Sequence, residues 1–151
     1  VLFRSQRLAR RVPLHDIARQ APPPALAGLV ERTDLPPAWR LPLQALLAIA
    51  PARVFGAFAW QALTGLAYVH ERSDVDLLWE VGEADAAAPL VAQLQAWERT
   101  FGRRVDGELC LPDGAAVNWR EYGGAAREVL VKRVDGAMLE ARDRLFEGAR
   151  A

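Results

Sequence analysis

Cysteine, histidine and lysine are scarce in this sequence. Its 151 residues include one cysteine, Cys110, and two histidines, so no disulfide can form within the chain and soft ligands alone cannot build a four-ligand zinc site. A metal, if one binds, is therefore expected on carboxylates. Net charge is also lacking, because 19 basic residues balance 19 acidic ones. This balance argues against sequence-independent nucleic-acid binding, although it leaves room for a local basic pocket.

Long apolar runs are absent as well. The longest stretch without charge, residues 54–69, contains Gln61 and Thr64 and is shorter than the ~20 apolar residues that a membrane-spanning helix needs. Residues 1–11 carry four arginines and no methionine start, unlike a secretory signal. We therefore expect a soluble, cytoplasmic protein that binds neither nucleic acid nor membrane and whose beginning has been cut.

What is present is enough apolar sequence for one globular domain, since 52% of the residues are apolar and 25% are charged. Six of the ten prolines lie in residues 12–37, which favours a weakly organised entry segment. The predicted division is a remnant of an N-terminal region in residues 1–53, with a proline-rich connector and a lead-in helix, followed by a catalytic domain in residues 54–151.

Apolar periodicity and turn residues predict the order of the elements. Helices are expected over residues 38–50, 58–63, 86–101, 119–127 and 138–146, and strands over residues 53–57, 74–81, 104–111, 115–118 and 128–133. Gly56 forms the tight turn between the first strand and the second helix. This mixed order predicts an α+β fold with a small mixed sheet flanked by helices.

Two aspartates separated by one residue mark the centre of chemical interest. Asp74 and Asp76 begin the strand over residues 74–81, so their side chains point to the same face, about 6 to 7 Å apart along the chain. Their mutual repulsion would be relieved by one bound Mg²⁺, which prefers oxygen ligands. The alternative is an ordinary turn at Ser73 and Asp74, with Asp76 merely exposed at an edge.

A third carboxylate favours the metal interpretation. Asp106 lies in the strand over residues 104–111, and if that strand adjoins the Asp76 strand, three carboxylates converge. Such a cluster can hold Mg²⁺ at a phosphate and leave Asp106 to accept the proton of an attacking hydroxyl. Glu108 shares the face of Asp106 and is a competing candidate for the base. Backbone amides at the Gly56 turn could contact a phosphate, although ordinary strand-to-helix turns are common.

The run Gly56-Ala57-Phe58-Ala59-Trp60-Gln61, with Ser73-Asp74-Val75-Asp76-Leu77-Leu78 after it, resembles the core of the phosphoribosyl-dephospho-CoA transferases. These enzymes are also called malonate decarboxylase holo-acyl carrier protein synthases. They are similar to the nucleotidyltransferases of the DNA polymerase β type. The downstream runs 104–109 and 112–121 resemble the same family, so the likeness covers roughly residues 54–146. One departure is Ala57, where the family usually has serine.

The resemblance implies a nucleotidyltransferase-like fold and a defined reaction. A triphosphoribosyl-dephospho-CoA donor would be attacked by a serine hydroxyl of the apo acyl carrier subunit of malonate decarboxylase, and diphosphate would leave. Asp74, Asp76 and Asp106 would bind Mg²⁺, and Asp106 could also act as base. The residues implied along the donor are Gly56, Ala57 and Ser73 at its triphosphate and the basic Arg72, Arg104, Arg120 and Lys132.

Two other functions stay open at this point. One is a Mg²⁺-dependent nucleotidyltransferase that uses an ordinary nucleoside triphosphate, and the other is a non-catalytic fragment that docks a carrier protein. Three tryptophans, Trp60, Trp79 and Trp97, are expected to be packing residues rather than a stacking platform for an adenine ring. Cys110 is expected to be a small, buried apolar residue, because no histidine is near it in the sequence.

Overall fold

A computed structural model describes residues 11–147 of the chain, so the first ten and the last four residues fall outside the description. The α-helices are α1 (Leu26–Val30), α2 (Arg40–Ile49), α3 (Gly56–Thr64), α4 (Ala84–Phe101) and α5 (Trp119–Tyr122), and short 3₁₀ turns span Leu14–Asp16, Pro37–Trp39 and Arg142–Arg144. The strands are β1 (Arg53–Phe55), β2 (Val75–Glu80), β3 (Val105–Cys110), β4 (Ala116–Asn118), β5 (Glu128–Arg133) and β6 (Gly136–Ala141). The expected α+β class is confirmed.

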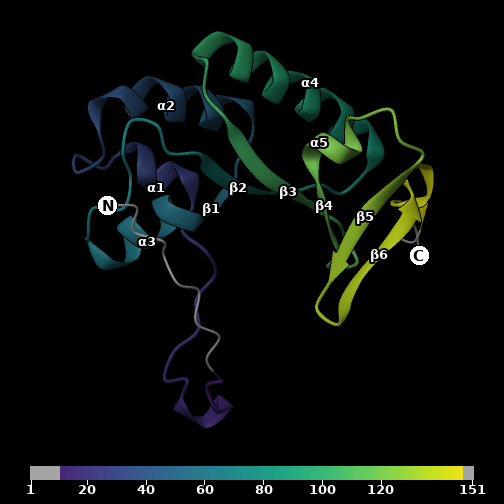
Figure 1. Cartoon of the computed structure of the whole chain (residues 1–151), viewed down its shortest axis with the longest axis horizontal. Coiled ribbons are helices and arrows are strands. Elements are labelled where there is room, and N and C mark those ends of the chain that lie inside the picture. Colours follow the sequence, from purple (N-terminus) through teal and green to yellow (C-terminus); the bar gives the residue numbers. More distant parts are fainter. Residues whose placement is uncertain (1–10, 148–151) are drawn as a thin grey trace, which may run out of the picture.

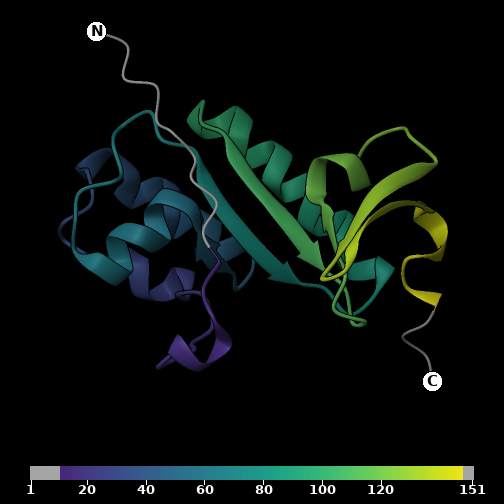
Figure 2. The same cartoon turned by 60° about the horizontal axis from the view of Figure 1, so that its bottom comes forward.

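The six strands form one mixed sheet in the order β1-β2-β3-β4-β5-β6. Only β2 and β3 pair in parallel, with the long helix α4 as the crossover between them, and all other neighbours are antiparallel. Figure 1 shows α2 and α4 together over one face of the sheet, with α1 and α3 at the β1 end. The β5–β6 hairpin lies at the other end (Figure 2).

Alternation along β2 and β3 decides which face is buried. Val75, Leu77 and Trp79 point into the core, and the residues between them are partly accessible. The same two-residue period continues in β3. α4 supplies the other side of this core with residues at helical spacing, which are Ala87, Leu90, Val91, Leu94 and Trp97. Side chains between these core positions therefore point to the opposite, more open face of the sheet.

The same core also takes in residues from α1 and α2. Leu26, Leu43 and Leu46 are buried with the sheet residues in one hydrophobic cluster. The core thus continues across residue 53, the predicted boundary between an N-terminal remnant and a catalytic domain. No helix of residues 11–147 is long and apolar enough to cross a membrane.

The last predicted element was wrong. Residues 138–146 were expected to form an amphipathic helix, but β6 pairs antiparallel with the whole of β5 and is followed by a 3₁₀ turn. Arg133 pairs with Gly136, so the connection is the two-residue loop Val134–Asp135, a length typical of β-hairpins. A short apolar run can satisfy both periods, and here pairing with the neighbouring strand decided the outcome.

Candidate active site

Asp76 and Asp106 lie directly beside each other on the two parallel strands. They are register partners in the β2–β3 ladder, and both are half-buried. Partners in a parallel ladder point to the same face of the sheet, with backbones about 4.8 Å apart. The structure therefore brings these two predicted residues together on the open face, opposite the helices α2 and α4.

The environment of Asp76 disfavours its charged form. Burial raises the pKa of the Asp76 carboxyl above its ordinary value, and the negative charges of Asp106 and Asp74 raise it further. Arg104 acts in the opposite direction but does not cancel these effects. A cation bound between the carboxylates would remove this penalty, because it would replace repulsion by attraction.

Gly56 begins α3 directly against Asp76. Its φ of +61° is one that residues with a side chain rarely adopt, and a Cβ built there would lie 2.0 Å from Oδ2 of Asp76. Pairing of Phe55 with Asp76 in the β1–β2 ladder sets this close approach. No side chain caps the N-terminus of α3. The first N–H groups of the helix thus start beside the carboxylates, and Ala57 is the second residue of that turn.

Hydrogen bonds fix the orientation of Asp106. Its Oδ1 accepts from the Gly107 N–H at 3.0 Å and from Nδ2 of Asn118 at 3.2 Å. Arg104 approaches Oδ2 at 3.4 Å. Asn118 also caps α5, since its Oδ1 accepts from the Arg120 N–H at 2.9 Å. Sequence analysis missed Asn118 as a positioning residue, and an asparagine at the end of a strand just before a helix is the signal that could have found it.

Asp74 lies one residue before β2 and is exposed. It lines a polar pocket at the beginning of β2 and β3, together with three other residues predicted for the site, which are Arg72, Ser73 and Arg104. The turn before them is closed by Ser73, whose Oγ accepts from the His70 N–H at 3.0 Å. This pocket therefore contains both cationic and anionic groups, and Arg104 connects it to Asp106.

The donor set suits a hard cation, although the described part of the chain contains no ready-made group of three. Among residues 11–147 no three His, Cys, Asp or Glu side chains lie close enough as placed to enclose one metal ion. Asp76 and Asp106 nevertheless offer paired carboxylate oxygens, the ligand type that Mg²⁺ takes while it keeps waters and substrate phosphates in its other positions. Burial first, and then the charges of Asp106 and Asp74, raise the pKa of Asp76 when no cation is bound. The residues present thus fit Mg²⁺.

Glu108 and Lys132 neutralise each other on the same face. The Lys132 Nζ donates to Glu108 Oε1 at 2.6 Å across the intervening strand β4. Glu108 is mostly buried, with 16% of its side chain exposed. Of the two candidate bases on β3, Glu108 is thus occupied by a lysine, while Asp106 faces Asp76.

Arg120 is bound by Glu98 rather than by the site aspartates, although the charges of Asp106 and Asp74 also help to raise the pKa of its guanidinium. Its guanidinium donates to both oxygens of Glu98, at 2.8 Å to Oε2, and to the Val105 carbonyl at 2.9 Å. It also stacks on the Trp119 ring, 4.3 Å from the centroid. These contacts join α4, β3 and α5, so the structure does not present Arg120 beside Asp76 in the way it presents Arg104.

The structure tests the predictions made for the tryptophans and shows a role for Gln61 that was not predicted. Trp60 is 57% exposed, so its expected role in packing was wrong, whereas Trp79 and Trp97 are buried as predicted. Gln61 is 2% exposed and its Oε1 accepts from the N–H groups of Tyr68 and Val69, at 3.1 and 2.9 Å. A lone amide in an apolar helix could have indicated this anchor, which holds the segment leading to Asp74. Cys110 is half-buried, and burial raises the pKa of its thiol.

Comparison with known proteins shows which family this chain is similar to. The family model described as phosphoribosyl-dephospho-CoA transferase MdcG C-terminal domain matches residues 25–143. The chain belongs to this transferase family. The match includes the sheet, all three aspartates and both helices that precede β1.

Curated relatives carry the same family name. Phosphoribosyl-dephospho-CoA transferase of Xanthomonas campestris pv. campestris is 52% identical over 146 residues, which are 93% of this chain and 68% of that protein. The Bradyrhizobium diazoefficiens enzyme of that name is 42% identical over 147 residues, 95% of this chain and 65% of the relative. The chain thus spans about two thirds of the length of these relatives. No solved structure matches it.

Proposed function

We propose that this chain transfers a phosphoribosyl-dephospho-CoA group from a triphosphate donor to a serine of an apo acyl carrier subunit, that of malonate decarboxylase. The serine Oγ attacks the phosphorus nearest the ribose, and the bond from that phosphorus to the rest of the triphosphate breaks. Diphosphate leaves and a phosphodiester remains on the carrier. The observation that carries this proposal is the pairing of Asp76 with Asp106 on one open face, with the start of α3 against them, in a chain of this family.

The carboxylates divide the work in this reaction. Asp74, Asp76 and Asp106 would hold Mg²⁺, which when bound supplies positive charge to the triphosphate and to the departing diphosphate. Asp106 would also accept the serine proton, because the bonds from Asn118 and Gly107 to one oxygen fix the direction of the other. Glu108 does not take that role, since Lys132 binds it.

The start of α3 and the polar pocket would receive the donor. Backbone N–H groups at Gly56 and Ala57 can bind phosphate oxygens, and the helix dipole adds positive potential there. Ser73, Arg72 and Arg104 line this pocket with Asp74, where the two arginines would neutralise the remaining phosphate charge and the Ser73 hydroxyl would contact a phosphate oxygen. Arg120 and Lys132 could join only after exchanging Glu98 and Glu108 for the donor.

A mass measurement on the carrier tests this function. The whole chain is incubated with Mg²⁺, the apo carrier subunit and either the triphosphoribosyl-dephospho-CoA donor or an ordinary nucleoside triphosphate. We expect a mass gain equal to one phosphoribosyl-dephospho-CoA group with the first donor only, and its disappearance when EDTA removes the metal. A gain only with the nucleoside triphosphate would reject the proposed donor.

The variant Asp76→Asn separates catalysis from docking. It keeps the size of the side chain but removes the metal-binding charge, so we expect the mass gain to disappear while the carrier subunit still binds. An unchanged mass gain in this variant would show that the carboxylates do not drive the reaction, and would favour an enzyme with its chemistry elsewhere.

A further inference from the structure

Four of the five tryptophans are buried. Three of these four donate the indole N–H to a hydrogen bond, and the fourth does not do so within residues 11–147. Trp39, Trp97 and Trp119 each donate the indole Nε1–H to a backbone carbonyl, at 3.0, 2.9 and 3.2 Å respectively. Trp79 is just as buried, with 1% of its surface exposed, but its Nε1–H has no hydrogen-bond partner within the described residues. A buried donor without a partner is costly, so this exception needs an explanation.

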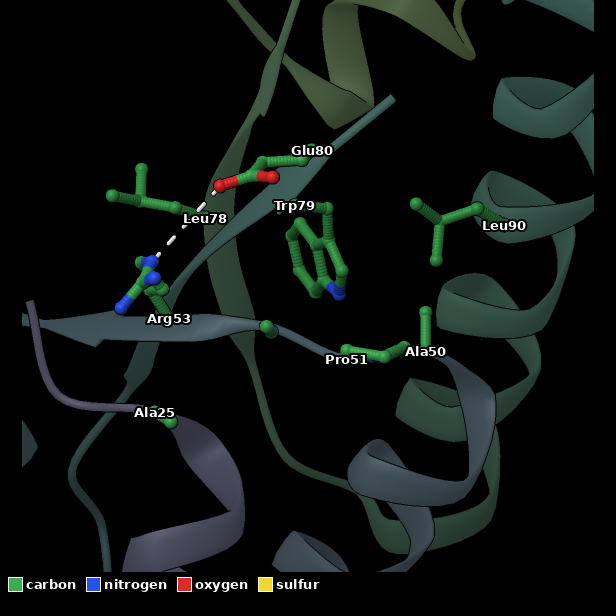
Figure 3. A pocket seen from close by; sticks show the side chains of 9 residues that line it. Ala25, Ala50, Pro51, Arg53, Leu78, Trp79, Glu80 and Leu90 are labelled. Atoms are coloured by element: carbon green, nitrogen blue, oxygen red, sulfur yellow. Dashed lines mark ion pairs between the residues drawn. The ribbon is translucent and has the colours of Figure 1, made fainter. Parts of the chain in front are cut away.

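The indole of Trp79 extends from the sheet toward a cavity. The outer edge of its six-membered ring lies over Gly107, where a Cβ would come within 2.7 Å of Cζ3. Figure 3 shows its nitrogen directed away from that strand, toward Ala50 and Pro51 and beside Leu90. These residues line a cavity of about 430 Å³ between β2, the α2–β1 connection and α4. This volume lies within the range of small-molecule sites.

The edge of β2 is also free at this cavity. The β1–β2 ladder stops at Arg53, which pairs with Leu78, so Glu80 lies beyond the end of this ladder. The Val81 N–H donates to β3 at 3.0 Å, and because directions alternate along a strand, the backbone groups of Glu80 face the other edge. Pro51 has no N–H to offer the Glu80 carbonyl. The cavity therefore combines one unpartnered indole donor with the part of β2 that lies beyond the β1–β2 ladder.

The rim of the cavity favours a neutral ligand. Arg53 and Glu80 form an exposed ion pair there at 4.0 Å, so their charges compensate each other (Figure 3). The walls between them and the indole are alanine, proline and leucine side chains. This site is separate from the carboxylates, because Glu80 lies four residues, about 13 Å, along β2 from Asp76, and Trp79 points to the opposite face.

We propose that this cavity binds a neutral molecule that carries an amide group on an apolar body. The amide carbonyl accepts the Nε1–H of Trp79, and the amide N–H faces the carbonyl edge at Glu80. Two sources have this chemistry: a free small amide, or the pantetheine arm of the donor, which contains two amides. The second source rests on the proposed function, whereas the cavity and its unpartnered donor do not.

Proton–nitrogen NMR on the ¹⁵N-labelled chain tests the proposal, because five tryptophans give five indole signals. The Trp79 signal is assigned by its absence in Trp79→Phe or, should that variant not fold, by its contacts with the Leu90 methyl groups. N-butylacetamide and pantetheine are titrated separately, without metal, carrier or triphosphate. We expect a saturable downfield shift of the Trp79 indole proton, while the signals of Trp39, Trp97 and Trp119 stay in place.

The variant Ala50→Leu is designed to block the cavity. It enlarges a side chain of the cavity wall at a residue with extended backbone and does not alter any of the carboxylates. We expect it to weaken probe binding at least about tenfold with unchanged thermal unfolding. A response to both probes supports a general amide site, and a response to pantetheine alone supports the donor arm as its source. No saturable shift with either probe, binding unaffected by Ala50→Leu, or a bound water on the indole proton that neither amide displaces would each overturn the proposal.

Discussion

Asp106 and Glu108 are two acids on one strand and one face, yet the sheet gives them different surroundings. In the β2–β3 ladder Glu108 lies opposite the apolar Leu78, and the Lys132 ammonium of β5 binds its carboxylate at 2.6 Å. Asp106 lies at the parallel β2–β3 ladder, where its register partner is another acid, Asp76. The negative charge of Glu108 is thus neutralised by a lysine, whereas the repulsion between Asp106 and Asp76 is only partly offset by Arg104. The difference teaches that the residue next door on the neighbouring strand, rather than acidity itself, separates a candidate metal ligand from a structural ion pair.

Amide substitutions on this strand give the largest expected contrast. We expect Asp106→Asn to lower the transfer rate about 10²- to 10⁴-fold, because the proposed function assigns Asp106 metal binding and proton acceptance, roles worth several kcal/mol in a transition state, and each 1.36 kcal/mol is tenfold. Glu108→Gln, the matched control two residues away, should stay within about threefold, since it loses a partly exposed ion pair. The measurement is the initial rate of mass gain on the carrier, and equal losses in both variants would erase the contrast.

The second largest effect is expected from a substitution at Gly56, which lies in close contact with Asp76. In Gly56→Ala the new Cβ would lie 2.0 Å from Asp76 Oδ2, and a φ of +61° would cost a further 1–2 kcal/mol, approximately. We expect lower thermal stability and a rate reduced more than tenfold. Gly28→Ala in α1 is the control, because no atom lies within 4 Å of its Cβ position. Thermal unfolding and transfer rates that fail to separate the two variants would contradict this account of Gly56.

Arg120 is predicted to act on stability rather than on the reaction rate. Arg120→Met would leave the Glu98 carboxylate without its bidentate partner and would remove one of the two side-chain donors to the Val105 carbonyl, the other being the Trp119 indole. Both side chains are partly exposed, so we expect a loss of about 1–2 kcal/mol in unfolding free energy, less than for a fully buried pair. Urea unfolding measures it, with Arg72→Met as control. A rate loss without a stability loss would instead indicate that Arg120 contacts the donor.

The smallest effect concerns pH and the repulsion at Asp76. Because burial and the charges of Asp106 and Asp74 raise the pKa of Asp76 in the folded chain above its ordinary value of 3.8, ionisation destabilises the fold. The contribution of Asp76 to stability is therefore complete at pH values below its pKa in the unfolded chain. It is lost as the pH rises through the pKa of Asp76 in the folded chain. Without metal, Asp76→Asn should unfold at a higher temperature than the wild type at pH 7, and the two curves should converge below about pH 4. Parallel curves over this range would contradict the raised pKa.

Much of the fold was predictable because its signals are local. Helix α4 combines apolar residues at helical spacing with a glycine after its last turn, and in the structure it ends at Phe101 with Gly102 as its C-cap. β2 and the β3–β4 hairpin were predicted from alternation and from the Pro112–Gly114 turn. The prediction for residues 138–146 was wrong, because the spacing of their apolar residues fits a helix as well as a strand. Residues up to Ala141 form a strand because they pair with β5.

The site could be predicted only in part, because the sequence does not show which strands are neighbours. The Asp-Val-Asp spacing indicated one shared face, but the sequence could not say which strand lies beside β2. Residues that orient or neutralise the acids come from other elements: Asn118 follows β4, and Lys132 lies on β5. The predicted role of Trp60 in packing failed for a related reason, since an apolar helix position is buried only where another element covers it.

The sequence by itself determined the elements around the site, the turn glycine and the spacing of the aspartates, because turns and periodicity depend on neighbours along the chain. Tertiary structure alone decided that Asp76 stands beside Asp106, that Glu108 is neutralised, and that the Trp79 N–H faces a cavity. These outcomes depend on strand order and register, which bring together residues 24 to 30 positions apart. Charge and hydrogen bonding act through space, so they are settled only when the sheet has formed.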